Sequence, residues 1–216
     1  MNEYTGTDFK EILEVFFTSP ERLPALLNKI DKEALIHYFV DILTRYANDV
    51  NSSTLRELIT ILKAGYEPQP PGTKLGHNGV TSHGNPCEVK PVNIHSGSGN
   101  KLNGGGNFSD FTYERLDRYK ESGLTMLVSG FVDGQLIYIL EFPFSCPKFI
   151  ERLQEQLEGQ FARGKRAPGQ FLRSAQFSFK HYKSCPQLKV IYKSTPLSDY
   201  SQFLTADLFN FLQGKR

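Results

Sequence analysis

A chain of 216 residues is long enough for one sizeable hydrophobic core, or for a core with a small additional domain. With 39% hydrophobic and 22% charged residues, its composition is that of a soluble globular protein, and no apolar run approaches the length that crosses a membrane. The formal net charge is only +2, so it does not by itself indicate a nucleic-acid partner, and the distribution of the charges matters more.

The first 65 residues are predicted to be helical. Capping residues and proline near a helix start indicate the first two helices, and apolar residues at helical spacing indicate the next two. The predicted helices cover residues 7–17, a segment starting at 19, 31–48 and 52–64. Their apolar stripes serve either the core or a subunit interface.

The character of the sequence changes after Gly65. Residues 65–86 are rich in Gly and Pro and are predicted to form turns and short extended pieces. A strand is expected over 87–94, followed by a polar Gly-rich loop and a helix around 113–120. Residues 124–144 then form the clearest hairpin, because two β-rich runs flank Asp133-Gly134, a pair typical of a type I′ turn.

The last third is predicted to combine helices and strands. A helix from about Pro147 to Phe161 and a basic loop precede strands at 175–182 and 187–193, and a final helix begins near Ser198. This order predicts an α+β fold with an α/β-type core, in which N-terminal helices precede a mixed β-sheet flanked by helices. We expect residues 1–66 to form a helical subdomain and residues 67–216 to form the core that carries the function.

The three cysteines, Cys87, Cys146 and Cys185, are scattered and have no CxxC spacing. They are therefore expected to be reduced thiols rather than a disulfide framework or a zinc site. The N-terminal residues show no basic-then-apolar signal pattern. We expect a cytoplasmic protein.

The most informative segment lies between Gly76 and Asn93. Glu88 and Lys90 are two residues apart on the predicted strand, so their side chains leave one face while Val89 points into the core. A carboxylate can hold a hard cation through oxygen, and an amine can orient or deprotonate an attacking water near a phosphate. Such a triplet is common by chance, but here it follows a turn-rich segment and precedes a polar Gly-rich loop.

The sequences NGV at 78–80 and HGNPCEVK at 83–90 resemble the active site of the PD-(D/E)xK nuclease superfamily, and especially its type II restriction endonucleases. In that family an acidic residue precedes the (D/E)xK strand by about ten residues, across a short β-hairpin. The matching position is Asn78, where the family pattern has an aspartate. The resemblance implies a restriction-endonuclease-like fold and a nuclease core in residues 67–216.

Two explanations account for the asparagine. The second acid can come from elsewhere, with Glu67 the nearest upstream candidate for an auxiliary acid, although Glu67 also suits a solvated turn. Alternatively, Asn78 replaces an aspartate in an inactive variant that holds DNA uncut. Under either explanation, Asn78 belongs to the site.

The resemblance implies a Mg²⁺-dependent mechanism. Glu88 and the side chain at position 78 would bind one or two Mg²⁺ ions, and Lys90 would position or activate the nucleophile. The neutral amide of Asn78 would bind Mg²⁺ more weakly than a carboxylate. No organic cofactor and no membrane partner are expected.

The implied protein is a homodimeric endonuclease that cuts a short palindromic site in double-stranded DNA, because a two-fold protein matches a two-fold sequence. The N-terminal helices are the expected dimer surface. The alternatives are a repair or recombination nuclease with structure specificity, and a non-catalytic DNA-binding protein with a decayed metal site.

Several polar residues are candidates for contacts with DNA bases or phosphates. They flank the predicted hairpin, lie in the Gly-rich loop, or belong to a basic and aromatic segment near the C-terminus, where a flexible loop or a solvated face is the alternative interpretation. The candidates are His77, His83, Lys101, Asn103, Asn107, Arg163, Lys165, Arg166, Arg173, Lys180, His181 and Lys183.

Overall fold

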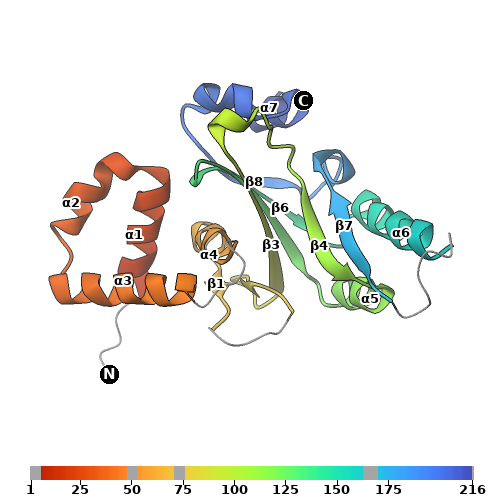
Figure 1. Ribbon diagram of the computed structural model, residues 1–216, viewed down its shortest axis with the longest axis horizontal. Coiled ribbons are helices and arrows are strands. Elements are labelled where there is room, and N and C mark those ends of the chain that lie inside the picture. The colour runs from red at the N-terminus through yellow and green to blue at the C-terminus, as the bar shows by residue number, and fades with distance from the viewer. Residues whose placement is uncertain (1–5, 48–52, 71–75, 163–169, 216) are drawn as a thin grey trace.

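The computed structural model shows a mixed α+β fold, and it describes residues 6–47, 53–70, 76–162 and 170–215 (Figure 1). Helices at the N-terminus precede a mixed β-sheet that has helices packed against it, so the predicted fold class is confirmed. Among the described residues, no helix is both long and apolar enough to cross a membrane.

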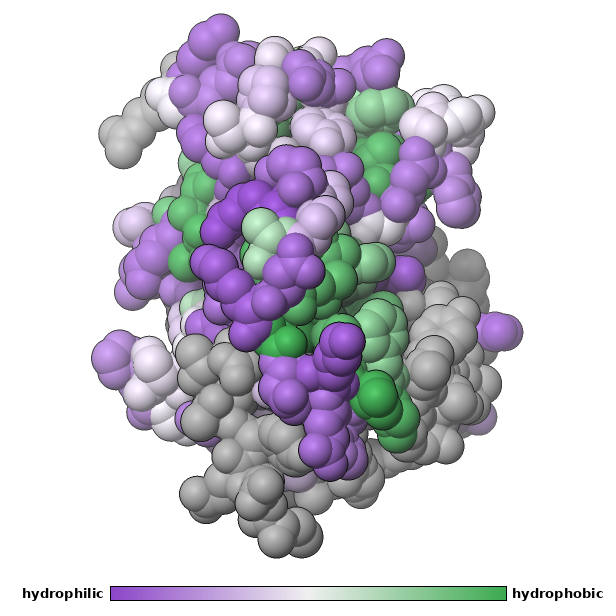
Figure 2. Space-filling view, turned by 90° about the vertical axis from the view of Figure 1, so that its left-hand side faces the viewer, coloured by the Kyte–Doolittle hydropathy of each residue, from purple (hydrophilic) through white to green (hydrophobic). Residues whose placement is uncertain are grey.

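The N-terminal helices form a group at one end of the molecule (Figure 1). They are α1 (Gly6–Thr18), η1 (Pro20–Arg22), α2 (Leu23–Leu27) and α3 (Lys32–Ala47). Their small core includes Ile12, Val15 and Tyr38. Figure 2 shows hydrophobic side chains gathered on the outer face of this end of the molecule. Among the side chains that the structure describes in α1 and α3, the exposed large hydrophobic residues are Phe16, Ile36, Phe39 and Val40. A dimer through this surface stays a prediction.

Helix α4 (Thr54–Lys63) packs on the sheet, although it precedes the expected boundary at residue 66. Its residues Ile59 and Ile61 share a buried cluster with Cys87 and Val89 of the sheet. Thr60 forms a buried hydrogen bond of 2.7 Å with Ser129 Oγ. Helices α1 to α3 lie at the left of Figure 1, and among them α1 also contacts α4 and strand β6.

The main sheet has six strands in the order β1-β2-β3-β5-β6-β8. Their bounds are β1 Glu67–Pro68, β2 Gly79–Val80, β3 Pro86–Ile94, β5 Thr125–Val132, β6 Gln135–Pro143 and β8 Lys189–Lys193. β3 and β5 are parallel, and the other neighbours are antiparallel. Parallel neighbours need a crossover connection, which here contains β4 (Gly106–Phe111) and helix α5 (Tyr113–Glu121).

The hairpin of β5 and β6 is the centre of the core. Asp133 and Gly134 both have positive φ angles, 48° and 80°, as a type I′ turn requires, so this prediction is confirmed. The two strands are buried along nearly their whole length, because α4 covers one face of the sheet and other elements cover the opposite face.

The opposite face is covered by α5, α6 (Pro147–Ala162), α7 (Ala206–Leu212) and a two-stranded sheet of β4 and β7 (Leu172–Phe177). Aromatic side chains fill the space between them. The rings of Phe142 and Tyr182 stack with their centroids 4.1 Å apart, and Phe149 packs against Phe142 edge-on at 5.0 Å. The high aromatic content therefore serves the core.

Two segments differ from the sequence-based expectation. Residues 106–111 form strand β4, whereas a loop was expected to lead directly into a helix. The strand begins with Gly106 and Asn107 and follows Asn103, Gly104 and Gly105, and residues of these types are typical of loops rather than strands. The strand expected at 175–182 lies at 172–177 and gives way to the 3-10 helix η3 (Phe179–His181). His181 Nδ1 accepts a hydrogen bond from the Ser178 backbone N–H, and this cap ends the extended backbone. The final helical segment begins with η4 (Leu197–Phe203), before α7.

Gly130 is expected to be essential for packing in β5. An added Cβ would lie 2.3 Å from Tyr138 Cε1 and 2.9 Å from Leu102 Cδ1, which are buried neighbours. Gly130→Ala should lower the free energy of unfolding by about 1–3 kcal/mol, measured by urea denaturation. Gly159→Ala in α6 is the control, because nothing lies within 4 Å of its added Cβ. Equal stability of Gly130→Ala and the parent would contradict this packing.

Candidate hydrolytic site

Strand β3 brings Glu88 and Lys90 together on one face. Lys90 Nζ donates a hydrogen bond of 2.6 Å to Glu88 Oε1, and only 5% of Glu88 is exposed. The intervening Val89 and the preceding Cys87 lie in the cluster beneath α4, as strand alternation requires. The sheet thus holds a carboxylate and an ammonium group in direct contact with little access to water.

Asn78 lies across the short β2–β3 hairpin from Glu88. Its backbone N–H donates to Cys87 O at 2.9 Å, and its side-chain Oδ1 accepts from the Val89 N–H at 2.7 Å. The Asn78 side chain therefore adds one hydrogen bond to β3 just before the start of β2. This position fixes the side chain at the edge of β3.

Glu57 of α4 completes the group. Asn78 Nδ2 donates a hydrogen bond of 2.8 Å to Glu57 Oε2, so the helix and the hairpin meet at this amide. Ser53, the residue before α4, lines the same pocket as Glu57 and Asn78. Glu57 thus brings a carboxylate from α4 into contact with Asn78 beside β3.

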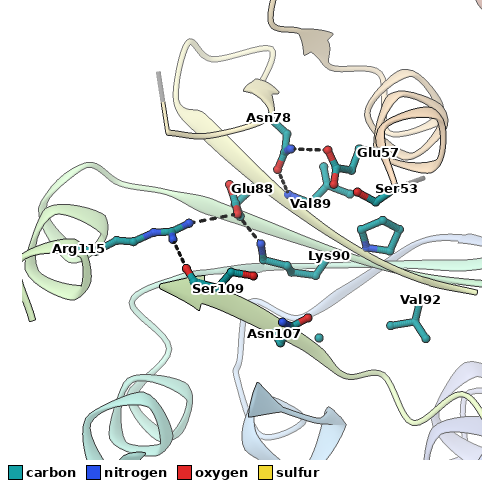
Figure 3. A pocket seen from close by; sticks show the side chains of 12 residues that line it. Ser53, Glu57, Asn78, Glu88, Val89, Lys90, Val92, Asn107, Ser109 and Arg115 are labelled. Atoms are coloured by element: carbon teal, nitrogen blue, oxygen red, sulfur yellow. Dashed lines mark hydrogen bonds and ion pairs between the residues drawn. The ribbon is translucent and has the colours of Figure 1, made fainter. Parts of the chain in front are cut away.

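These residues line a polar pocket of about 380 Å³ along the edge of β3 that β2 leaves unpaired (Figure 3). Pro91 lies on this edge, where the absence of an N–H group costs no pairing. The pocket is lined by Ser53, Glu57, Asn78, Glu88, Val89, Lys90, Pro91, Val92, Gly106, Asn107, Ser109 and Arg115.

A second cation reaches the pocket from α5. Arg115 Nη2 lies 3.8 Å from Glu88 Oε1, on the side of the carboxylate that is drawn opposite Asn78 in Figure 3. Thr112 caps α5, because its side chain accepts a hydrogen bond of 3.1 Å from the Arg115 backbone N–H. The cap fixes Arg115 in the first turn of the helix.

Burial changes the acidity of two groups near Glu88. Burial, followed by the charge of Glu88, raises the pKa of the Cys87 thiol to about 12. The pKa of the Tyr119 hydroxyl is also raised, mainly by burial and then by Glu88. Cys87 is therefore a neutral thiol in the core and not a nucleophile, since the thiolate is the reactive form.

Gly106 permits β4 to approach Lys90 closely. An added Cβ would lie 2.7 Å from Lys90 Cβ and 2.8 Å from Phe177 Cζ. Gly106→Ala should displace Lys90 and lower any Lys90-dependent cleavage about 10²-fold, because small misplacements of catalytic groups are costly. Gly97→Ala is the matched control, with nothing within 4 Å of its added Cβ. An unchanged rate in Gly106→Ala would show that this close approach is not needed.

Of the residues singled out in the sequence, the pocket brings together Asn78, Glu88, Lys90 and Asn107. Glu67 is exposed on β1 opposite Val80 and does not line the pocket. His181 is engaged in the cap of η3, and Lys183 Nζ forms an ion pair of 2.9 Å with Asp207.

The other candidates for DNA contact do not line this pocket. The described ones are His77, His83, Lys101, Asn103, Arg173 and Lys180. Arg163, Lys165 and Arg166 lie outside the described residues.

Sequence reasoning missed Glu57, Arg115, Ser53 and Ser109. Arg115 carried one local signal, because a cation in the first turn after a Thr cap is unfavourable beside the positive end of the helix dipole and indicates another role. Glu57 carried none, since a glutamate in the first turn of a helix is ordinary.

The donor set suits a hard cation in chemical type. Glu57, Glu88 and Asn78 all present side-chain oxygen atoms, the ligands that Mg²⁺ prefers. Within the described part of the chain, no group of three or more His, Cys, Asp or Glu side chains is placed to hold a metal ion. Asn78 contributes an amide rather than a carboxylate to this donor set, and its Oδ1 already accepts from the Val89 N–H.

Comparison with known proteins adds no assignment. No family model matches the chain, and no curated protein matches it.

Proposed function

We propose that this chain is a Mg²⁺-dependent endonuclease that hydrolyses phosphodiester bonds in double-stranded DNA, of the PD-(D/E)xK type. The observation that carries the proposal is the contact of Glu88 and Lys90 on one face of β3, with Asn78 directly across the hairpin in the same polar pocket. This is the arrangement implied by the resemblance of residues 76–93.

Glu88, Glu57 and the position-78 side chain would hold the metal. When bound, Mg²⁺ polarises the scissile phosphate and lowers the pKa of a coordinated water. Glu88 is held by Lys90 and approached by Arg115, so its orientation is set before a substrate enters. Such preorganisation removes a reorganisation cost from the reaction.

Lys90 orients the attacking water. Its ammonium group has three donors, of which one is directed at Glu88 Oε1, and its Nζ lies 4.6 Å from the centre of the Phe108 ring. The Phe108 ring is buried in the core, so the ammonium group lies between this ring and the pocket that Lys90 lines. Lys90 can therefore bridge the carboxylate and a water molecule beside the phosphate.

Asn78 determines how strongly the metal is held. If Asn78 is the working residue, the second acid comes from another position. Glu57 is the candidate for this acid in place of Glu67, because Glu57 lines the pocket. In the second explanation an aspartate belongs at position 78, where it would face Glu57 Oε2 and complete a three-carboxylate site.

A second candidate function is DNA binding without cleavage. It is favoured by the amide of Asn78, which is hydrogen-bonded at both Oδ1 and Nδ2 and so fits its surroundings without a metal. In this case the pocket has lost its chemistry while the fold persists.

The test is incubation of a mixed-sequence plasmid with Mg²⁺, with EDTA as the control. We expect this chain or its Asn78→Asp variant to give discrete fragments with Mg²⁺ and none with EDTA. Cutting confined to branched or cruciform DNA would replace sequence specificity by structure specificity. Intact DNA in every lane, together with binding to duplex DNA, would overturn the nuclease in favour of the second candidate.

A further inference from the structure

Arg115 is a cation of the pocket whose side chain is already fixed. Its Nε donates to the Tyr119 hydroxyl at 2.9 Å, and its Nη1 donates to the Ser109 carbonyl at 2.7 Å. The remaining nitrogen, Nη2, is directed toward Glu88 in Figure 3. About a quarter of the side chain is exposed, so the group can still meet a ligand.

Aromatic rings hold the guanidinium plane. Its central carbon lies 5.1 Å from the centre of the Tyr119 ring and 5.7 Å from that of Phe108, both within the range of cation–π contacts. The Tyr119 hydroxyl in turn donates to Gly76 O at 2.7 Å, which ties α5 to the chain entering the hairpin. The position of Arg115 is therefore set by β4, α5 and the hairpin together.

Neutralising Glu88 does not account for Arg115. Lys90 already donates to Glu88 Oε1 at 2.6 Å, whereas Arg115 Nη2 stops at 3.8 Å, beyond hydrogen-bond length. A residue placed only to compensate the carboxylate would make the shorter contact. The helix N-terminus adds a positive partial charge beside Arg115, so this side of the pocket favours an anion.

We propose that Arg115 binds a phosphate group of the DNA substrate, through a charge-assisted hydrogen bond from Nη2 to a non-bridging oxygen. This role rests on the proposed function and makes Arg115, with Lys90, the phosphate-binding side of the pocket. Guanidinium groups match phosphate oxygens in geometry and stay charged at any working pH.

The experiment compares Arg115→Ala and Arg115→Lys with Arg118→Ala, an exposed arginine one turn further along α5. Binding to mixed-sequence duplex DNA is measured in EDTA over a range of salt concentrations. Arg115→Ala should weaken binding about 10-fold and reduce the slope of log affinity against log salt by about one. Arg115→Lys should keep the slope, and Arg118→Ala should match the parent.

Cleavage in Mg²⁺ supplies a second readout. Arg115→Ala should lower the cleavage rate about 10²–10³-fold, and free guanidinium ion should restore part of it, because it can occupy the vacated position. A salt slope for Arg115→Ala equal to that of the parent would overturn the proposal. A lower cleavage rate of Arg115→Ala that guanidinium does not restore, and that is accompanied by a lower Tm, would also overturn it. If the parent and Asn78→Asp bind but never cut DNA, the nuclease fails, while the salt slope still decides whether Arg115 holds phosphate.

Discussion

Replacement of Glu88 by Gln is expected to lower the rate of Mg²⁺-dependent plasmid cleavage by about 10²–10³-fold, the usual cost of removing one preorganised electrostatic group. The amide keeps the shape of the side chain but removes the charge that would hold the metal, and it weakens the charge-assisted hydrogen bond that Lys90 donates to Glu88 over 2.6 Å. Lys90→Ala should cost about 10²–10⁴-fold if Lys90 orients or deprotonates the water.

The matched control is Glu141→Gln. Glu141 is a buried carboxylate, like Glu88, and it lies on strand β6. Its partners are the Tyr66 hydroxyl and Lys189, so it belongs to a separate ion pair. Glu141→Gln should lower the free energy of unfolding, but the cleavage rate per amount of folded protein should equal that of the parent. Equal effects of the two substitutions on cleavage would assign a structural role to Glu88.

Replacement of Asn78 by Asp is expected to raise the Mg²⁺-dependent cleavage rate by about 10² or more, because an anionic ligand replaces a neutral one. In the absence of metal the new carboxylate faces Glu57 Oε2, at a position where Asn78 Nδ2 now donates over 2.8 Å. The loss of this donor and the like charges should lower the free energy of unfolding by about 1–3 kcal/mol.

Thermal unfolding with and without Mg²⁺ checks the binding side of this prediction. A ligand present at one hundred times its Kd stabilises the folded protein by about 2.7 kcal/mol. The Tm of Asn78→Asp should therefore rise more on addition of Mg²⁺ than the Tm of the parent. Asn93→Asp is the control, since Asn93 lies near the end of β3 and does not line the pocket, and its Oδ1 accepts a hydrogen bond from the Gly134 N–H. A variant that cuts no faster than the parent would make Asn78 the working residue, with Glu57 as the second acid.

The sequence predicted those parts of the fold and site that local patterns determine. Alternation along β3 was enough to place Glu88 and Lys90 on one face, and the Asp133-Gly134 pair was enough to place the central turn. The family resemblance, with its spacing of about ten residues before Glu88, placed Asn78 across the hairpin. Each of these depends on residues near one another in the chain.

The remaining parts depend on long-range packing. Glu57 and Asn78 are 21 positions apart in sequence, and they meet because α4 packs on the sheet. Arg115 meets Glu88 because the connection between β3 and β5 contains β4 and α5. Glu67 was the nearest acid in sequence, but two-residue pairing in β1 directs it to the surface. No local pattern distinguishes such residues from solvated glutamates and arginines.

Cleavage of mixed-sequence plasmid DNA in Mg²⁺ should be compared between the parent, Asn78→Asp and the double variant Asn78→Asp/Glu88→Gln. We expect discrete fragments from Asn78→Asp and intact DNA from the double variant at equal amounts of folded protein. Intact DNA from the parent and from both variants, or the same fragments from both variants, would contradict the assignment of this pocket as a nuclease site.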